Sequence, residues 1–158
     1  MTDSRSTELH EGSRIGETAD LALSAFGLGW HYEAGLEWVR LVAAGVFDEL
    51  PDLQIILGHW GEVALFYLER TGAVLDRALD LDRSLAECAR RNLYVTGSGM
   101  WSESYLRRWL DIVGPERLLF STDFPTSTDP EGSLADLPRV LNSTTRRGQA
   151  WHAVTGRG

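Results

Sequence analysis

Three short apolar runs, each followed by polar residues, most strongly constrain what this chain can fold into. The runs are LQIIL (53–57), NLYVTGS (92–98) and LLFSTDFP (118–125). Between and before them, residues 31–47, 63–79 and 101–114 space their apolar side chains as amphipathic helices do. Strands that are apolar on both faces and alternate with helices are typical of parallel sheets built from right-handed βαβ units. The sequence therefore predicts an α/β fold.

Two further segments carry helix signals. Ser84 and Glu87 have the spacing of a capping box, which predicts a short helix that continues through Arg91. Residues 134–141, LADLPRVL, predict another short helix after the third strand.

Composition and charge exclude several classes of protein. The chain has 158 residues, of which 43% are hydrophobic and 24% are charged, as in a single globular domain. Its net charge is −8, and its basic residues form only short pairs such as Arg107-Arg108, which argues against nucleic-acid binding. No apolar run approaches the roughly 20 residues that span a membrane. Cys88 is the one cysteine, so we expect no disulfides and a cytoplasmic location.

Each predicted strand ends in a compact polar segment. These segments are Gly58-His59-Trp60-Gly61-Glu62, Thr96-Gly97-Ser98-Gly99 and Ser121-Thr122-Asp123-Phe124-Pro125. Functional sites in parallel α/β folds are built at the carboxyl ends of the strands. No glycine-rich phosphate loop follows any strand, so a doubly wound nucleotide-binding module of flavodoxin type has little support. The sequence therefore predicts a site at this edge that does not bind a nucleotide.

The residue types in these segments suit proton transfer and metal binding. His59 can move protons near neutral pH, and Glu62 could orient its imidazole and raise its basicity. Asp123 offers a hard oxygen ligand to a divalent ion, while Trp60 and Phe124 could wall a substrate pocket. The alternatives are a core histidine at His59 and a turn residue at Asp123. Glu62 is also expected to open the helix at 63–79 as its first-turn acid, a role compatible with orienting His59.

The segments LQIILGHWGE and ERLLFSTDFP, in this order, resemble the amidohydrolase superfamily. The resemblance is to the branch that contains aminocarboxymuconate-semialdehyde and resorcylate decarboxylases, and GLEWVRLVAAGVFDELPDLQ and NLYVTGSG support it. It implies a (β/α)8 barrel with a divalent ion, zinc or manganese, at the carboxyl face. It further implies that His59 is the catalytic histidine after strand six, that Glu62 orients it, and that Asp123 binds the metal and shares in proton transfer.

The resemblance leaves two assignments open for His10. It could be the metal ligand that ends strand five, although the residues before it are polar. Alternatively, Glu8-Leu9-His10 spells the family's strand-one Glu-x-His signature, which would leave strands two to four absent. We favour the strand-five assignment. With only His10 and Asp123 as ligands, metal binding should be weak, because such sites normally use three or more.

The chain is too short for a complete barrel of this type, which normally needs about 200 residues or more. We therefore expect the C-terminal half, about strands 5–8, of a TIM-type barrel. Residues 1–26 would form a polar segment with a remnant of strand five, residues 27–141 the half barrel, and residues 142–158 an irregular tail. An open half barrel favours a homo-oligomer or a complementary half barrel as partner.

The expected function is that of a truncated metal-dependent enzyme. The resemblance favours a carboxy-lyase that decarboxylates a small aromatic or unsaturated acid, with a hydrolase as the sister option. The alternative is a non-catalytic barrel fragment, or one half of a split enzyme. Outside these candidates, His31 is expected to open its helix rather than to bind a ligand, and Cys88 to be an inert buried side chain.

Overall fold

A computed structural model of the chain describes residues 16–99, 102–119 and 121. The helices are α2 (Glu17–Leu21), α3 (Gly29–Ala43), α4 (Val46–Glu49), α5 (Leu68–Ala78), α6 (Leu85–Asn92) and α7 (Glu103–Ile112). A π-helix, η1 (Ala22–Gly27), joins α2 to α3, and two 3₁₀ turns are η2 (His59–Gly61) and η3 (Pro115–Arg117). The strands are β1 (Ile55–Leu57), β2 (Leu93–Thr96) and β3 (Leu118–Leu119).

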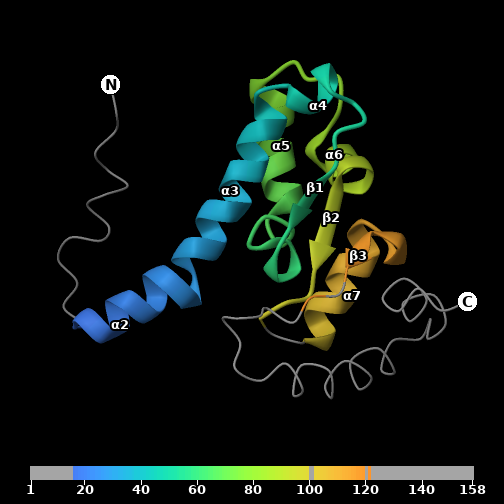
Figure 1. Ribbon diagram of the computed structural model, residues 1–158. Helices are drawn as coiled ribbons and strands as arrows, with labels where there is room; N and C mark the ends of the chain where they lie inside the picture. The colour runs from blue at the N-terminus through green and yellow to red at the C-terminus, as the bar shows by residue number, and fades with distance from the viewer. Residues whose placement is uncertain (1–15, 100–101, 120, 122–158) are drawn as a thin grey trace, which may run out of the picture.

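The strands form one parallel sheet in the order β1-β2-β3 (Figure 1). Leu57 lies beside Val95, and Thr96 lies beside Leu119. The predicted α/β fold with a parallel sheet is therefore confirmed for the described part of the chain. β1 covers only the last part of its apolar run, from Ile55, and β2 ends at Thr96, before Gly97 and Ser98.

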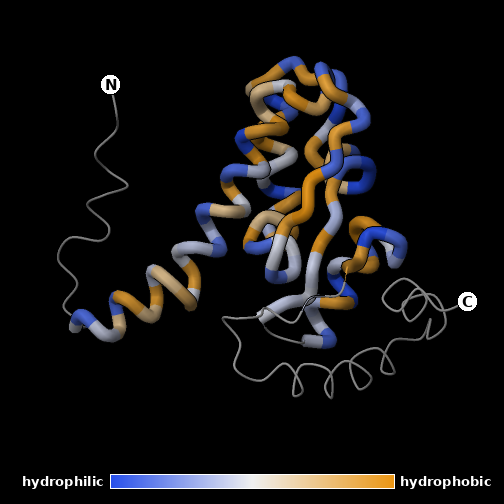
Figure 2. Tube along the Cα trace, viewed as in Figure 1, coloured by the Kyte–Doolittle hydropathy of each residue, from blue (hydrophilic) through white to orange (hydrophobic). Residues whose placement is uncertain are grey.

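The core lies between the sheet and the helices that cover it. Trp38 of α3, Phe47 of α4 and Trp109 of α7 are almost fully buried, as are Leu93 and Val95 of β2. Figure 2 shows the apolar segments of β1 and β2 running through the middle of this body. Trp38 and Trp109 thus pack the fold, as their helical spacing predicts. Cys88 is buried and free, and burial raises the pKa of its thiol, which agrees with an inert side chain.

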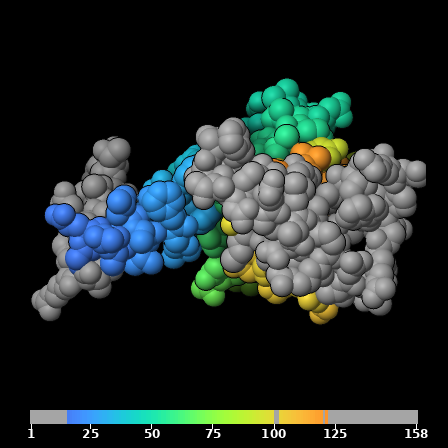
Figure 3. All heavy atoms as spheres, turned by 60° about the horizontal axis from the view of Figure 1, so that its bottom comes forward, coloured from blue at the N-terminus to red at the C-terminus, as the bar shows by residue number. Residues whose placement is uncertain are grey.

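The N-terminal helices form an arm that projects from this body. α2 and η1 continue into α3 with only a bend at Leu28, and Figure 3 shows their atoms to one side of the rest. The sequence predicted no helix before residue 31, because the apolar residues of this stretch lack the spacing of a helix face that packs against a core. Six large apolar side chains of the arm are more than half exposed: Leu21, Leu23, Phe26, Leu28, Trp30 and Tyr32. A surface of this kind is typical of a contact with further protein.

Two predicted helix boundaries differ from the structure. The helix expected at 31–47 divides into α3 and α4, because Gly45 adopts a left-handed conformation with φ 75° between them. The helix expected at 63–79 begins only at Leu68, since residues 62–66 form turns. The prediction that Glu62 opens this helix is therefore wrong.

The capping box at α6 is confirmed. The Ser84 hydroxyl accepts from the Glu87 backbone N–H at 3.3 Å, and the Ser84 N–H donates to Glu87 Oε2 at 2.9 Å. Hydrogen bonds from the Ser84 backbone and hydroxyl hold the pKa of Glu87 below its usual range. The box therefore stabilises the fold above the ordinary glutamate pKa and weakens as the pH falls through the lowered value.

Replacing Ser84 with alanine should destabilise the fold by about 1 kcal/mol at neutral pH, the usual cost of losing an N-cap. Urea unfolding of both proteins at pH 7 and at pH 3 would measure the effect. The difference should shrink as the pH falls through the lowered pKa of Glu87, because protonation of Glu87 already weakens its half of the box. An equal difference at both pH values would contradict this account of the cap.

Two other observations complete the fold. Within the described ranges, none of the helices has the length and apolar character needed to cross a membrane. The helix predicted at 134–141 and the tail at 142–158 lie outside the described residues.

Candidate active site

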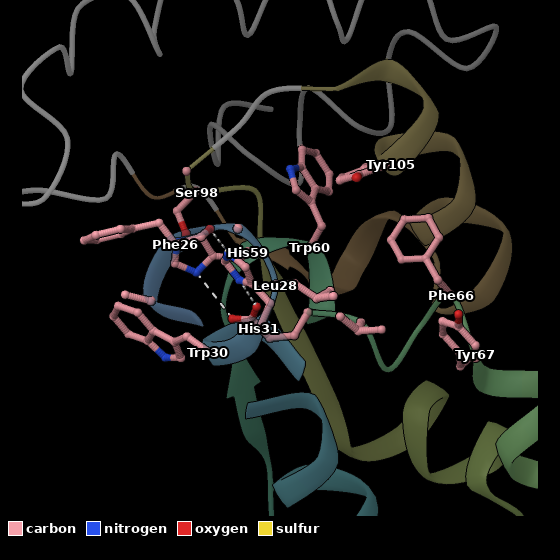
Figure 4. A pocket seen from close by; sticks show the side chains of 15 residues that line it. Phe26, Leu28, Trp30, His31, His59, Trp60, Phe66, Tyr67, Ser98 and Tyr105 are labelled. Carbon is pink, nitrogen blue, oxygen red and sulfur yellow. Dashed lines mark hydrogen bonds and ion pairs between the residues drawn. The ribbon is translucent and has the colours of Figure 1, made fainter. Parts of the chain in front are cut away.

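A cavity of ≈ 590 Å³ lies at the carboxyl edge of the sheet (Figure 4). Its wall includes His59, Trp60 and Glu62, which follow β1, and Ser98 and Gly99, which follow β2. The polar segments after these two strands thus meet at one edge, as the strand order requires. For the third strand, Ser121 is described, whereas Asp123 and Phe124 lie outside the described residues, as does His10.

Glu62 is the buried centre of the site. Its side chain is 5% exposed and lies between two imidazoles. Oε1 is 3.3 Å from His59 Nδ1, and Oε2 is 2.5 Å from His31 Nδ1. A buried carboxylate is costly unless charged or hydrogen-bonding partners surround it. The two imidazoles meet that requirement, and Glu62 lies beside His59, the residue that it is expected to orient.

His31 reaches this site from α3, although its sequence position gave no sign of it. It does lie in the first turn of its helix, as predicted. Its Nε2 is 3.0 Å from the backbone oxygen of Phe26, and its ring centroid is 5.0 Å from that of His59. The contact is possible because α3 approaches the chain after His59 closely: a Cβ on Gly35 would lie 3.0 Å from the Ala64 nitrogen. Only this packing, and no local motif, could have shown that His31 belongs to the site.

The backbone that carries His59 and Glu62 is held in an uncommon conformation. His59, Trp60 and Glu62 have φ angles of 40°, 63° and 52°. Left-handed conformations are unfavourable for residues with a Cβ, and they cluster at functional sites. The turn is closed by hydrogen bonds from Gly61 N to Gly58 O at 2.8 Å and from Glu62 N to His59 O at 3.2 Å. This turn places His59 and Glu62 on the same side of the chain.

Gly99 sets the position of the His59 ring on the opposite side. A Cβ at Gly99 would lie 2.5 Å from His59 Cδ2 and 3.0 Å from Nε2. Since Nδ1 faces Glu62, the Nε2 edge lies on the Gly99 side of the ring. The imidazole therefore sits between a carboxylate that orients it and a backbone with no side chain in its way.

Aromatic side chains form much of the remaining wall. Trp60 lies against Tyr105 with ring centroids 6.5 Å apart, and Phe66 lies 4.8 Å from Tyr105. Phe26, Trp30 and Tyr67 also line the cavity (Figure 4). The structure thus places Trp60 at the cavity. A cavity of this size with aromatic walls and few polar groups suits a small planar molecule.

The same polar groups could also hold a metal ion. One ligand atom each from His31, His59 and Glu62 lies within 4.8 Å of the others. Imidazole nitrogens with one carboxylate oxygen are the donors that zinc and related divalent ions use in catalytic sites.

The profile of the amidohydrolase family matches residues 8–144, which is most of the sequence. The chain belongs to the amidohydrolase family. The resemblance seen in the strand-end motifs is therefore confirmed.

Two relatives within this family are decarboxylases. The amidohydrolase chain is 37% identical over 115 residues to decarboxylase orsB of Emericella nidulans, covering 71% of this chain and 35% of the relative. It is 37% identical over 98 residues to gamma-resorcylate decarboxylase of Rhodococcus jostii, covering 59% of this chain and 30% of the relative. It thus spans about a third of the length of these curated relatives.

A solved structure from Staphylococcus aureus, assigned to the amidohydrolases, shares the fold with a TM-score of 0.80 and 29% sequence identity. The match covers 98% of this amidohydrolase chain and 48% of the Staphylococcus chain. Solved neighbours of this kind are TIM barrels, and the described three-stranded parallel sheet is consistent with part of such a barrel.

Proposed function

We propose that this chain carries part of the active site of a metal-dependent decarboxylase that acts on a small aromatic acid, with the catalytic histidine at the carboxyl edge of the sheet. The observation that carries the proposal is the pairing of His59 with the buried Glu62 on the wall of an aromatic cavity. The decarboxylase relatives support the reaction class, and gamma-resorcylate, named for one of them, supplies a first substrate to test. Hydrolysis of a related acid derivative is the second option within the same family.

In the proposed reaction, the ring of the acid lies among the aromatic walls with the carboxylate-bearing carbon near His59. His59 donates a proton to that carbon, the bond to the carboxylate breaks, and its electrons return to the ring as carbon dioxide leaves. Glu62 holds the ring through Nδ1, so the proton transfer uses Nε2. His59 then regains a proton from solvent, so that the enzyme returns to its starting protonation state.

A divalent ion belongs to this proposal because the residue types fit one. Asp123 and His10 are the ligands that the family resemblance implies, and nitrogen and oxygen donors of this kind suit zinc or manganese. When bound, such an ion supplies positive charge that binds and polarises the substrate carboxylate. The strand assignment is part of the same proposal: β1, β2 and β3 would be strands six, seven and eight of the barrel.

The direct test is an assay of the purified protein supplied with Mn²⁺ or Zn²⁺ and gamma-resorcylate. We expect release of carbon dioxide together with the decarboxylated phenol, measured by gas detection and chromatography. Glu33→Gln, at an exposed position of α3, should retain this activity and serves as the control. Folded protein that binds the metal but releases no carbon dioxide from gamma-resorcylate or other small aromatic acids would overturn the assignment.

A second candidate, one half of a two-part barrel, is favoured by the exposed apolar surface of the arm. Ile56 on β1 is also 61% exposed, although it lies on a barrel-type strand. Such side chains are normally covered by further protein. Size-exclusion chromatography with light scattering should then show association or co-purification with a second half barrel, whereas a well-behaved monomer would count against it.

A further inference from the structure

We infer that His31, His59 and Glu62 form a divalent-cation site of their own, with a ligand set separate from Asp123 and His10. The inference goes beyond the proposed decarboxylation, in which His59 and Glu62 move and orient a proton. It adds His31, a residue to which neither the family motifs nor the helix pattern gives a role.

The first argument concerns which ring nitrogen of His31 donates to the backbone. A backbone carbonyl can only accept, so the contact from His31 Nε2 to Phe26 O at 3.0 Å requires the hydrogen on Nε2. Nδ1, the atom that faces Glu62, shares a hydrogen with Oε2 across 2.5 Å, and a divalent ion bound there would displace that hydrogen. Metal-binding histidines have this arrangement, with the second ring nitrogen donating to a backbone carbonyl or a carboxylate. His31 is thus already oriented as a ligand.

The second argument is that three donor atoms lie close to one another. Nδ1 of His31 and Nδ1 of His59 each approach a different oxygen of the same carboxylate, and all three ligand atoms lie within 4.8 Å. Donors around one ion at about 2.1 Å lie roughly 3 to 4 Å from one another. A small rotation of the Glu62 carboxylate would open the short contact with His31 to that spacing.

The third argument is burial combined with access. Glu62 is 5% exposed, while the side chains of His31 and His59 are 25% and 26% exposed and line the cavity. Three protein ligands with an open side match the pattern of zinc sites that hold two histidines and one glutamate. The remaining coordination positions would face the cavity and could take water or a small carboxylate. The donor set favours a zinc-class ion over magnesium or calcium, which prefer oxygen ligands alone.

Binding there would have a consequence for the proposed reaction. An ion on Nδ1 of His59 and on the Glu62 carboxylate replaces the contact through which Glu62 orients the catalytic ring. Excess zinc should therefore inhibit turnover, and loss of His31 should relieve that inhibition. This consequence rests on the proposed function, whereas the binding itself does not.

The test is a titration of the purified, metal-stripped protein with Zn²⁺ and Co²⁺, followed by calorimetry and by the visible absorption of bound Co²⁺. We expect the Asp123→Asn variant still to bind one ion per chain, with imidazole ligands. His31→Gln and Glu62→Gln should each weaken the binding of that ion. The loss of affinity should exceed the roughly 10- to 100-fold that is typical of removing a residue that only hydrogen-bonds to a metal ligand. Glu33→Gln, which removes an exposed carboxylate from α3, should bind as the wild type does.

A measurement on the unmodified chain guards against variants that fold poorly. In the Co²⁺-loaded wild type, proton NMR should show strongly shifted, exchangeable imidazole N–H signals from both His31 and His59, in addition to any from the separate Asp123 and His10 site. Equal binding by His31→Gln and the wild type, with folding confirmed by circular dichroism, would overturn the inference. So would the absence of shifted signals from His31 and His59. Neither result depends on whether the protein decarboxylates anything.

Discussion

Replacing His59 with asparagine is expected to lower kcat for decarboxylation by about 10²- to 10⁴-fold, the usual contribution of a positioned acid or base. The loss corresponds to roughly 3 to 5 kcal/mol in the activation barrier. Asparagine is the suitable replacement because His59 has a φ of 40°, and asparagine adopts left-handed conformations more readily than most residues. The substitution therefore removes the imidazole while keeping the turn that carries Glu62.

Initial rates with saturating metal and aromatic acid would measure this effect. Thermal unfolding of His59→Asn should stay close to that of the wild type, which separates a chemical loss from an unfolded protein. Glu33→Gln is the control for a polar change that does not contact the cavity. If His59→Asn kept more than about a tenth of the wild-type kcat, His59 could not be the proton donor, because general acid catalysis is worth more than that.

The features that could be predicted from the sequence are those that depend on neighbouring residues. The apolar runs at 53–57 and 92–98 predict β1 and β2, and the polar residues after each run do meet at one edge. The capping box at Ser84 is local as well, since both of its partners lie in the first turn of α6. Likewise, the contact between His59 and Glu62 joins residues three apart and forms within a single turn.

The features that the sequence did not reveal depend on packing between distant segments. His31 and Glu62 are 31 positions apart, and their contact requires α3 to lie directly on the turn after β1. Gly35 permits that approach, but its role is visible only once the Ala64 nitrogen is known to lie against it. The late start of α5 has a similar origin. Residues 63–67 are apolar enough for a helix, yet the left-handed turn at 59–62 directs them into turns instead.

Gly99→Ala provides a test of how tightly the His59 ring must be held. Gly99 has a φ of 80°, and a Cβ there would lie 2.5 Å from His59 Cδ2. Contacts below about 3 Å between such atoms cannot persist, so either the ring or the chain after β2 must move. A displacement of about 1 Å at a catalytic group can cost on the order of 10²-fold in rate. We therefore expect a loss of that size in kcat.

Gly45→Ala is the matched control for this substitution. Gly45 has a φ of 75°, close to that of Gly99, but nothing lies within 4 Å of a Cβ at that position. Both variants should lose about 1 to 2 kcal/mol in the free energy of unfolding, because alanine disfavours the left-handed conformation. Only Gly99→Ala should also lose activity and shift the His59 ring signals in an NMR spectrum. If the two variants lost the same small fraction of kcat, close contact with Gly99 would not position the ring, and Glu62 alone would have to orient His59.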